Sequence, residues 1–320
     1  MALLLREDDV TRLLSMADAL TAVEKVFRFH GCGDATNMPR SRVRTSGGML
    51  HVMSGGVTPL NVAGLKTYTT TRQGARFAVL LFQADTGALL AIIEADRLGQ
   101  LRTGAASGVA TKYMARTDTR TVGIVGTGWQ ARSQLAAVCG VRDIELIRVF
   151  GRDETRRLLF CREMSETLGL PVLPAESTEE AVRDADVVIT VTSAREPVLM
   201  GRHLKPGAHI NAAGSNALDR REIDKETVRR AKIIAVDAKD QARIECGDLV
   251  EPIAQSLISW DAIHELGDIV AGRAAFLRAD DDITLFESHG LAIQDLAVAA
   301  FVYTRARENG AGIEIPGFEK

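Results

Sequence analysis

Short apolar runs rich in β-branched residues alternate with longer segments of helical periodicity from about residue 121 onward. The runs predict strands at 121–125, 145–150, 186–192, 209–213, 232–236 and 283–286. One helix between them is marked by Ser177 and Glu180, which predict a capping box. Strands that alternate with helices favour a parallel sheet with helices on both faces. The pattern therefore predicts an α/β domain built on a doubly wound parallel sheet.

The first 115 or so residues follow a different pattern, which predicts a separate α+β domain. A helix is predicted over 16–30, and Gly-punctuated strands follow, with a hairpin turn at 85–87. Residues 291–307 predict an amphipathic helix that packs back on this first domain. We expect one domain over 1–115 plus 295–320 and a second over 116–294.

Composition and charge narrow the class of protein. The chain has 320 residues, 46% of them hydrophobic, and a formal net charge of -3. This length suits about two domains with sizeable cores. The charge, without clustered Lys and Arg between aromatics, argues against nucleic acid as a partner. Apolar runs such as 78–82 are far shorter than the ~20 residues of a membrane helix, and the N-terminus is a poor secretion signal. We expect a cytoplasmic protein with no membrane partner.

The four cysteines are scattered along the chain, at Cys32, Cys139, Cys161 and Cys246. They form no CxxC pair, and no histidine stands at ligand spacing from them. We therefore expect four buried thiols, with neither a disulfide framework nor a metal site.

The stretch 126–131, Gly-Thr-Gly-Trp-Gln-Ala, fits the GxGxxG/A pattern where a strand ends and a helix begins. Gly126 permits a sharp turn, Gly128 lets a pyrophosphate approach the backbone, and Ala131 allows close contact between helix and strand. The N-terminal end of a helix also favours an anion. A plain strand-to-helix turn is the alternative. The next predicted strand follows some twenty residues later, as a Rossmann-type βαβ unit requires, and favours a dinucleotide.

The second strand of this unit ends in Phe-Gly-Arg-Asp at 150–153. Arg152, with Arg156 one turn later, suits the 2′-phosphate of NADP, so we favour NADP(H) over NAD(H). Asp153 leaves an alternative open, because it either caps the next helix or takes the ribose of NAD. A methyltransferase, which also uses a glycine turn, is a remote option.

Five stretches, at 62–71, 101–116, 123–134, 212–224 and 283–299, together resemble the ornithine cyclodeaminase/mu-crystallin family. The resemblance covers essentially the whole chain. It implies a Rossmann domain for the nucleotide and a second α+β domain for substrate binding and dimerisation, and hence a homodimer. The family includes ornithine cyclodeaminases, amino-acid dehydrogenases, ketimine or cyclic-imine reductases, and mu-crystallins that bind NADPH and thyroid hormone.

The resemblance also implies roles for individual residues. Lys66 matches the family's active-site lysine, and Arg102 matches its clamp on the substrate carboxylate. A second carboxylate contact falls on either Arg40 or Arg42, because that loop is spaced ambiguously. With the glycine turn and the arginine after the second strand, the expected cofactor-binding residues are Thr103, Gly126, Thr127, Gly128, Trp129, Gln130, Arg152, Thr192, Ser193, Ala213, Gly214, Ser215 and Ser288.

These residue types suit the chemistry of a small amino or imino acid. A guanidinium binds a carboxylate as a fork and so fixes the adjacent carbon. Lys66 stands in a mostly uncharged stretch, so desolvation and neighbouring arginines should lower its pKa towards a useful acid/base range. We expect Lys66 to exchange a proton with the substrate nitrogen or to activate a water.

Asn216 departs from the cyclodeaminases, which carry an aspartate thought to act as acid/base at the matching position. An amide can orient an amine or a water but cannot transfer a proton as a carboxylate does. We therefore predict an NAD(P)H-dependent oxidoreductase that acts on the C–N bond of a small 2-amino or 2-imino acid. Ornithine cyclodeaminase is the first alternative, and a non-catalytic, mu-crystallin-like NADPH-dependent binding protein is the second. The exact substrate stays open, and Arg72 or Arg76 either meets a second carboxylate or faces solvent.

Overall fold

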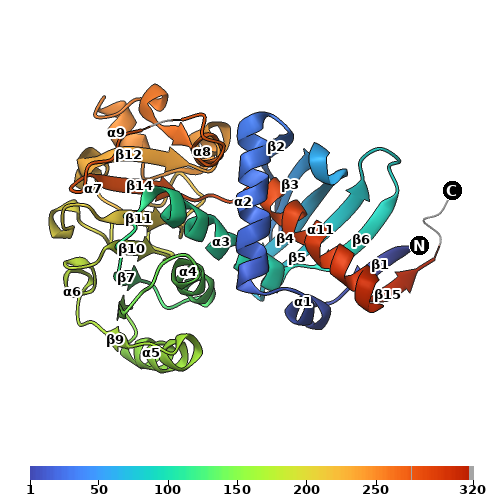
Figure 1. Ribbon diagram of the computed structural model, residues 1–320, viewed down its shortest axis with the longest axis horizontal. Coiled ribbons are helices and arrows are strands. Elements are labelled where there is room, and N and C mark those ends of the chain that lie inside the picture. The colour runs from blue at the N-terminus through green and yellow to red at the C-terminus, as the bar shows by residue number, and fades with distance from the viewer. Residues whose placement is uncertain (275, 317–320) are drawn as a thin grey trace. The chain divides into compact units, whose positions relative to one another are not determined.

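The computed structural model describes residues 1–274 and 276–316, which form two compact units (Figure 1). Unit 1 contains Met1–Arg102 and the chain from Gly290 onward, and unit 2 contains Thr103–His289. The first boundary falls inside one continuous helix, α3 (Asp96–Met114). The hydrophobic pattern predicted boundaries after residues 115 and 294, because it marks the ends of elements and not a division within a helix.

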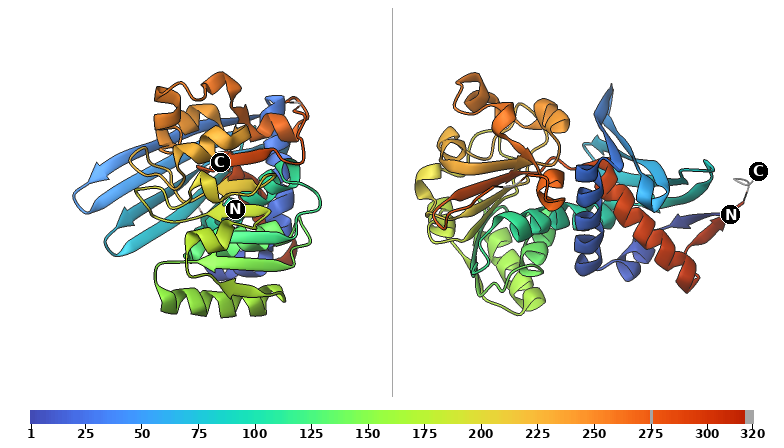
Figure 2. Two further views of the ribbon diagram at one scale, coloured as in Figure 1. Left: turned by 90° about the vertical axis from the view of Figure 1, so that its left-hand side faces the viewer. Right: turned by 45° about the horizontal axis from the view of Figure 1, so that its top comes forward.

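Unit 1 is a seven-stranded sheet with helices packed on it. The strand order is β15-β1-β6-β5-β4-β3-β2, and neighbours are antiparallel except for β1 and β6. The long β2/β3 and β4/β5 ribbons are evident in Figure 2. The expected turn at 85–87 joins β5 to β6. The strands are β1 (Ala2–Leu5), β2 (Ala35–Thr45), β3 (Gly48–Val57), β4 (Val62–Thr71), β5 (Gly74–Gln83), β6 (Leu89–Glu94) and β15 (Ile313–Ile315).

The helices of unit 1 include α1 (Glu7–Leu13), α2 (Met16–Cys32), α11 (Ala292–Asn309) and the short η1 (Thr58–Leu60). Helix α11 lies across β3, β4 and β5 and against α2 (Figure 1). Its first eight residues, from Ala292 to Ala299, are buried all round. The sequence pattern predicted an amphipathic helix here, but only the later turns of α11 have an exposed side. The buried turns carry Gln294 and Asp295 into the interior.

Unit 2 is an eight-stranded, wholly parallel sheet of order β13-β12-β14-β11-β10-β7-β8-β9. From β7, the next strands in the chain, β8 and β9, are added on one side of it, and β10 and β11 are added on the other side. This reversal of strand order is typical of a Rossmann fold. All six predicted strands are present, and β9 and β13 are additional. The strands are β7 (Thr121–Val125), β8 (Leu146–Phe150), β9 (Val172–Pro174), β10 (Val187–Thr190), β11 (His209–Ala212), β12 (Ala231–Val236), β13 (His264–Glu265) and β14 (Ile283–Glu287).

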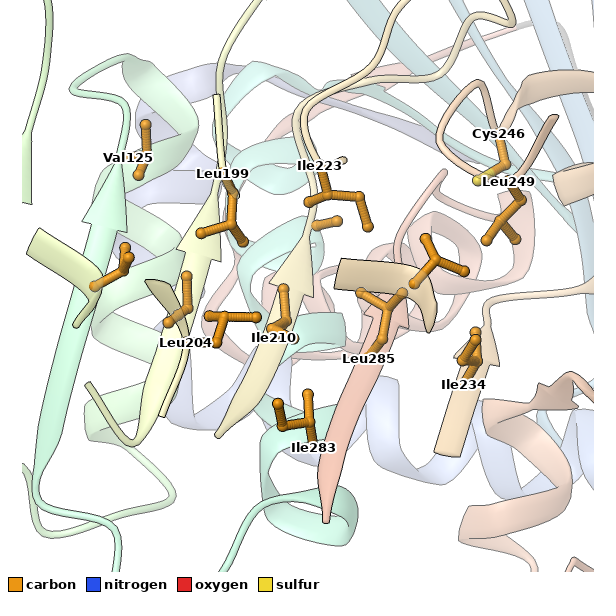
Figure 3. Packing of buried hydrophobic residues seen from close by; sticks show 14 of the residues in the cluster. Val125, Leu199, Leu204, Ile210, Ile223, Ile234, Cys246, Leu249, Ile283 and Leu285 are labelled. Atoms are coloured by element: carbon orange, nitrogen blue, oxygen red, sulfur yellow. The ribbon is translucent and has the colours of Figure 1, made fainter. Parts of the chain in front are cut away.

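Helices cover both faces of this sheet, which confirms the doubly wound architecture. On one face, Val122 and Ile124 pack with α4 (Trp129–Cys139) and α5 (Glu154–Leu168). On the other face, Val125 lies in a core that includes residues of α6 (Thr178–Val182), α7 (Lys225–Arg230) and α8 (Lys239–Glu245) (Figure 3). The remaining helices of unit 2 are η2 (Gly201–His203), α9 (Val250–Ala254), η3 (Trp260–Ala262) and α10 (Leu266–Val270).

The predicted cap of α6 forms in part. The Ser177 side chain accepts from the backbone N–H of Glu180 at 3.1 Å. The Glu180 carboxylate accepts from the N–H of Glu176 at 2.8 Å, one residue before the helix cap. Among all the helices described, none is both long and apolar enough to cross a membrane.

Candidate active site

Lys66, Arg102 and Asp295 form a buried cluster in unit 1. The strand register places Lys66 on β4 between Met53 of β3 and Val79 of β5. Its Nζ atom donates to Asp295 Oδ1 at 2.8 Å, and Arg102 Nε donates to the same oxygen at 2.9 Å. Relative exposures of 3% for Lys66 and 0% for Asp295 mean that this ion pair is shielded from bulk water.

Arg40, and not Arg42, joins this cluster. The pairing of β2 with β3 shifts register between Met38 and Ser41, and Arg40 lies at this irregularity. Arg40 is 5% exposed, donates to the carbonyl of Gly290 at 3.5 Å and lies over the Tyr68 ring, whereas Arg42 is exposed. Two arginines two residues apart on a regular strand would share a face, so spacing alone could not separate them.

Two glycines make room for the cationic side chains. A Cβ atom on Gly99 of α3 would lie 2.7 Å from Lys66 Nζ. A Cβ atom on Gly290 would lie 2.4 Å from Arg102 Nη1, and Gly290 also adopts a φ of +81°. Any larger residue at either position would displace the lysine or the guanidinium.

Burial lowers the pKa of Lys66 to about 8, against the opposing effect of Asp295 and with help from Arg102 and Arg40. This agrees with the expected direction of the shift. Lys66 and Arg102 donate to one carboxylate, and Arg40 lies close enough to act on Lys66, so the cluster has an excess of positive charge in either protonation state of Lys66. An organic anion suits such a site because it balances that charge.

Asp295 and Gln294 were not selected from the sequence. Gln294 Oε1 accepts from Arg102 Nη1 at 3.2 Å, and Asp295 Oδ2 is buried without a hydrogen-bond partner among the described residues. In the sequence both stand within the first turns of a helix, where polar residues are common on the solvent side. A signal was present in their position three and four residues after Leu291, inside an otherwise apolar run.

A separate open cavity of about 1160 Å³ lies in unit 2, at the carboxyl ends of β7, β8 and β10. This is the switch point of the strand order, where open α/β sheets bind ligands. The volume is somewhat above the usual range of about 300–1,000 Å³ for small-molecule sites. Its lining is drawn from three segments, namely residues 125–128, 150–156 and 191–198.

The glycine turn has the geometry that dinucleotide binding requires. Gly126 has a φ of +121°, and a Cβ there would lie 2.4 Å from the carbonyl oxygen of Val191. A Cβ on Gly128 would meet open space, and Gly128 caps α4 with no side-chain hydrogen bond. Ala131, in the first turn of α4, is fully buried. The residues therefore fit a dinucleotide whose pyrophosphate lies at the start of α4.

Six expected cofactor residues line the cavity, and the others lie elsewhere. The lining includes Gly126, Thr127, Gly128, Arg152, Thr192 and Ser193. Trp129 and Gln130 begin α4 outside this lining, and the carbonyl of Thr103 accepts from Gln134. The half-buried segment after β11 contains Ala213, Gly214, Ser215 and Asn216, and Ser288 is buried after β14 with its hydroxyl 3.5 Å from Asp237.

Asp153 serves as the N-cap of α5. Its carboxylate accepts from the backbone N–H of Arg156 at 2.9 Å. Arg152 and Arg156 are exposed and line the cavity together with Arg195. Of the two alternatives that the sequence left open for Asp153, its carboxylate therefore forms the helix cap.

The cysteines are free thiols, but they are not all buried. Cys161 and Cys246 are buried, Cys139 is half-buried, and Cys32 is exposed at the end of α2. The sulfur of Cys246, a carboxylate oxygen of Glu287 and a ring nitrogen of His289 lie within 4.8 Å of one another. The spacing of residues in the sequence does not indicate this grouping, because Cys246 is 41 residues before Glu287 and Glu287 is 2 residues before His289.

A Rossmann unit with a cavity at its switch point, together with a buried lysine and arginine cluster suited to a carboxylate, defines a nucleotide-dependent enzyme of small organic acids. The particular family follows from comparison with known proteins. The chain belongs to the ornithine cyclodeaminase/mu-crystallin family, whose model matches residues 2–310.

Similar proteins include enzymes of imino and amino acids. Δ1-Pyrroline-2-carboxylate reductase of Bacillus cereus is 38% identical over 264 residues, which are 80% of this chain and 81% of that protein. The Thermococcus litoralis reductase of the same name, solved with NADH and L-proline, is 37% identical with a TM-score of 0.93, over 98% of this chain and 100% of that one. An archaeal alanine dehydrogenase dimer with bound NAD is 33% identical with a TM-score of 0.92, over 98% of each chain.

These findings establish the class of reaction. The chain is an NAD(P)-dependent oxidoreductase that acts on the C–N bond of small 2-amino or 2-imino acids.

Proposed function

We propose that the protein reduces a cyclic 2-imino acid of the Δ1-pyrroline-2-carboxylate type to the corresponding 2-amino acid. The observation that carries this proposal is the buried cluster of Lys66, Arg102 and Asp295, with Arg40 beside it. It combines an anion site with a proton donor of suitable pKa. The similarity to two Δ1-pyrroline-2-carboxylate reductases supports the choice of substrate.

Arg102 and Arg40 bind the substrate carboxylate in this proposal. Arg102 is held by Asp295 and Gln294, so its guanidinium is oriented before the substrate arrives. Such preorganisation lowers the entropic cost of fixing the reacting carbon. Arg40, held at the carbonyl of Gly290, adds a second positive charge.

Lys66 donates a proton to the imine nitrogen. With a pKa of about 8, its side chain is mostly protonated at neutral pH and is still a better acid than an ordinary lysine. Asp295 holds the ammonium in place and stabilises its charge. The chemistry that NAD(P)H would supply when bound is the hydride for the imine carbon. In the reverse direction, neutral Lys66 accepts the proton of the amine.

The experiment that tests the function is a substrate panel with the purified protein. Pyrroline and piperideine carboxylates, and 2-oxo acids with ammonia or methylamine, are mixed with NADPH or NADH, and loss of reduced-coenzyme absorbance is followed. We expect the highest kcat/KM for a cyclic imino acid. Coenzyme binding that responds to the imino acid without turnover would instead indicate a binding protein like the mu-crystallins.

Asn216 separates this proposal from ornithine cyclodeaminase. An amide at this position cannot supply the acid/base carboxylate that the cyclodeaminases carry there. We expect no conversion of ornithine to proline and ammonia with catalytic NAD. Formation of both products without net reduction of the coenzyme would reverse the order of the two candidates.

We further propose that NADP(H) is preferred over NAD(H). Arg152 and Arg156 line the cavity with exposed guanidinium groups, and the carboxylate of Asp153 is engaged as a helix cap. Two arginines near the adenosine ribose would pair with a 2′-phosphate. The test compares kcat/KM for both coenzymes in the natural protein and in Arg152→Ser, with Arg162→Ser, a change of an exposed arginine within α5, as control. A ratio that is unchanged by Arg152→Ser contradicts the proposal.

Finally, we propose a homodimer that forms through the sheet of unit 1. On β3, β4 and β5, the side chains that alternate with the buried Met53, Lys66 and Val79 are only partly buried, and several are apolar. These include Val52, Leu65 and Leu80. A face of this kind suits a second copy of the chain.

A further inference from the structure

Glu222 is a buried carboxylate of unit 2 that the proposed proton transfer does not use. It is 1% exposed, and its side chain joins the ends of two neighbouring strands, β10 and β11. Oε1 accepts from the backbone N–H of Thr192 at 2.5 Å and from its hydroxyl at 2.7 Å. Oε2 accepts from the N–H of Gly214 at 2.7 Å and from the hydroxyl of Thr190 at 3.1 Å.

The backbone of Glu222 also contacts the segment that follows β10, at the far end of that segment from Thr192. Its carbonyl oxygen accepts from the N–H groups of Val198 and Leu199, at 2.8 and 2.9 Å. The cavity segment 191–198 is therefore tied to this one residue at both of its ends.

Gly214 is shaped to this contact. A Cβ atom there would lie 2.5 Å from the Glu222 carboxylate and 2.4 Å from the backbone nitrogen of Thr192. The absence of a side chain thus lets the carboxylate reach both strand ends at once. Asp248 fixes Glu222 in turn, because its Oδ1 accepts from the N–H groups of Glu222 and Ile223 at 2.7 and 2.9 Å.

The electrostatic surroundings oppose ionisation of Glu222. Burial, together with the nearby Asp248, raises its pKa to about 7, against the hydrogen bonds from Thr192 and Gly214. Glu287, on the neighbouring strand β14, is a second acidic group that interacts with it. Arg221 acts on Asp248 from the adjacent position in the chain. The ionised carboxylate loses its hydration on burial, and hydrogen bonds from four donors compensate for that loss.

We infer that Glu222 is a positioning residue for the coenzyme, whose carboxylate holds the segments after β10 and β11 in the conformation that binds NAD(P)H. This inference relies on the cavity of unit 2 being the coenzyme site. The carboxylate accepts hydrogen bonds on both oxygens, so it fixes Thr192 and Gly214 together. A neutral amide of the same shape has one acceptor oxygen and places an N–H₂ group against one of the two backbone donors.

The test is the isosteric variant Glu222→Gln, with NADH binding followed by fluorescence from pH 6 to 8. NADH is used because the 2′-phosphate of NADPH itself titrates near pH 6. We expect the Kd for NADH to rise about tenfold or more at pH 8, while kcat at saturating coenzyme changes by less than about threefold. In the natural protein, Kd should rise as the pH falls through 7, and the variant should lose this dependence.

Glu245→Gln is the matched control, because Glu245 is a fully buried carboxylate of the same unit that bonds Gln241 and lies outside the cavity lining. Its Kd and pH profile should match those of the natural protein. Failure of the natural protein to bind NADH or NADPH would overturn the proposed function. A Glu222→Gln variant with natural affinity and pH profile would overturn only this inference.

Thr190→Val keeps the inference testable if Glu222→Gln does not fold, as judged by its melting transition. This change removes one of the four hydrogen bonds and leaves the carboxylate in place. We expect a smaller rise in Kd, of about two- to fivefold, in the same direction. An unchanged Kd would count against the positioning role.

Discussion

Lys66 sets the expected pH dependence of catalysis at the scale of a single residue. Burial lowers the pKa of its ammonium to about 8. Imine reduction requires the protonated form, so at saturating coenzyme the kcat/KM for the imino acid should be constant below pH 7 and fall as the pH rises through 8. Amine oxidation requires the neutral form and should rise over the same interval. Profiles in both directions check the sign, and parallel profiles would contradict it.

Lys66→Met tests the same group by removing it. Loss of a general acid typically costs about 10²- to 10⁴-fold in rate, so kcat should fall by at least about 100-fold and the break near pH 8 should vanish. Coenzyme binding in unit 2 should be unaffected. A variant that keeps most of its activity would show that the proton comes from another source.

Asp295 is the second residue with a defined prediction. Its carboxylate accepts from both Lys66 and Arg102. Asp295→Asn should lower the pKa of Lys66, because the charge that raises it is gone, and the break in the reduction profile should move below pH 8. Removing one partner of a buried ion pair also costs about 3–5 kcal/mol of stability. Asp118→Asn is the control and should cost less than about 1 kcal/mol, because the Asp118 carboxylate that pairs with Arg116 is exposed to water.

At the scale of elements, the two glycines of the turn between β7 and α4 have different roles, because Gly126 is required by the fold and Gly128 by the proposed coenzyme site. Gly126→Ala should lower the melting temperature, because an alanine is strained at a φ of +121° and its Cβ would meet Val191. Gly128→Ala should leave the melting temperature nearly unchanged, since the added methyl group meets open space, yet it should weaken NADH binding by filling the pyrophosphate site. Equal thermal destabilisation by both changes would contradict this division.

At the scale of the whole molecule, the proposed dimer predicts a change of mass on mutation. Leu80→Glu places a charge on the partly buried face of β5, and we expect it to convert a dimer into a monomer in light scattering. Leu159→Glu is the matched control, because Leu159 is 62% exposed on α5. The dimer proposal fails if Leu80→Glu keeps the mass of the natural protein, or if the natural protein is itself monomeric.

The chain's local patterns were sufficient for most of the fold. The six strands of unit 2 follow from apolar runs, and the turn at Gly126 follows from the spacing of small residues. Both signals are local, because strand formation and the left-handed φ of a glycine depend on near neighbours. Lys66 and Arg102 could also be identified from the sequence, because they lie in motifs that resemble a known family. Strands β9 and β13 were missed because three and two residues are too few for a period to appear.

The sequence by itself therefore determined the layered α/β architecture, the glycine turn after β7 and the cationic residues Lys66 and Arg102 of the proposed substrate site. Only the tertiary structure selected Arg40 over Arg42, brought Asp295 to Lys66 across 229 residues and placed Glu222 beneath both Thr192 and Gly214. The physical reason is that burial and charge pairing depend on which elements pack together. A polar residue on a helix or loop has the same local pattern whether it faces water or a buried lysine.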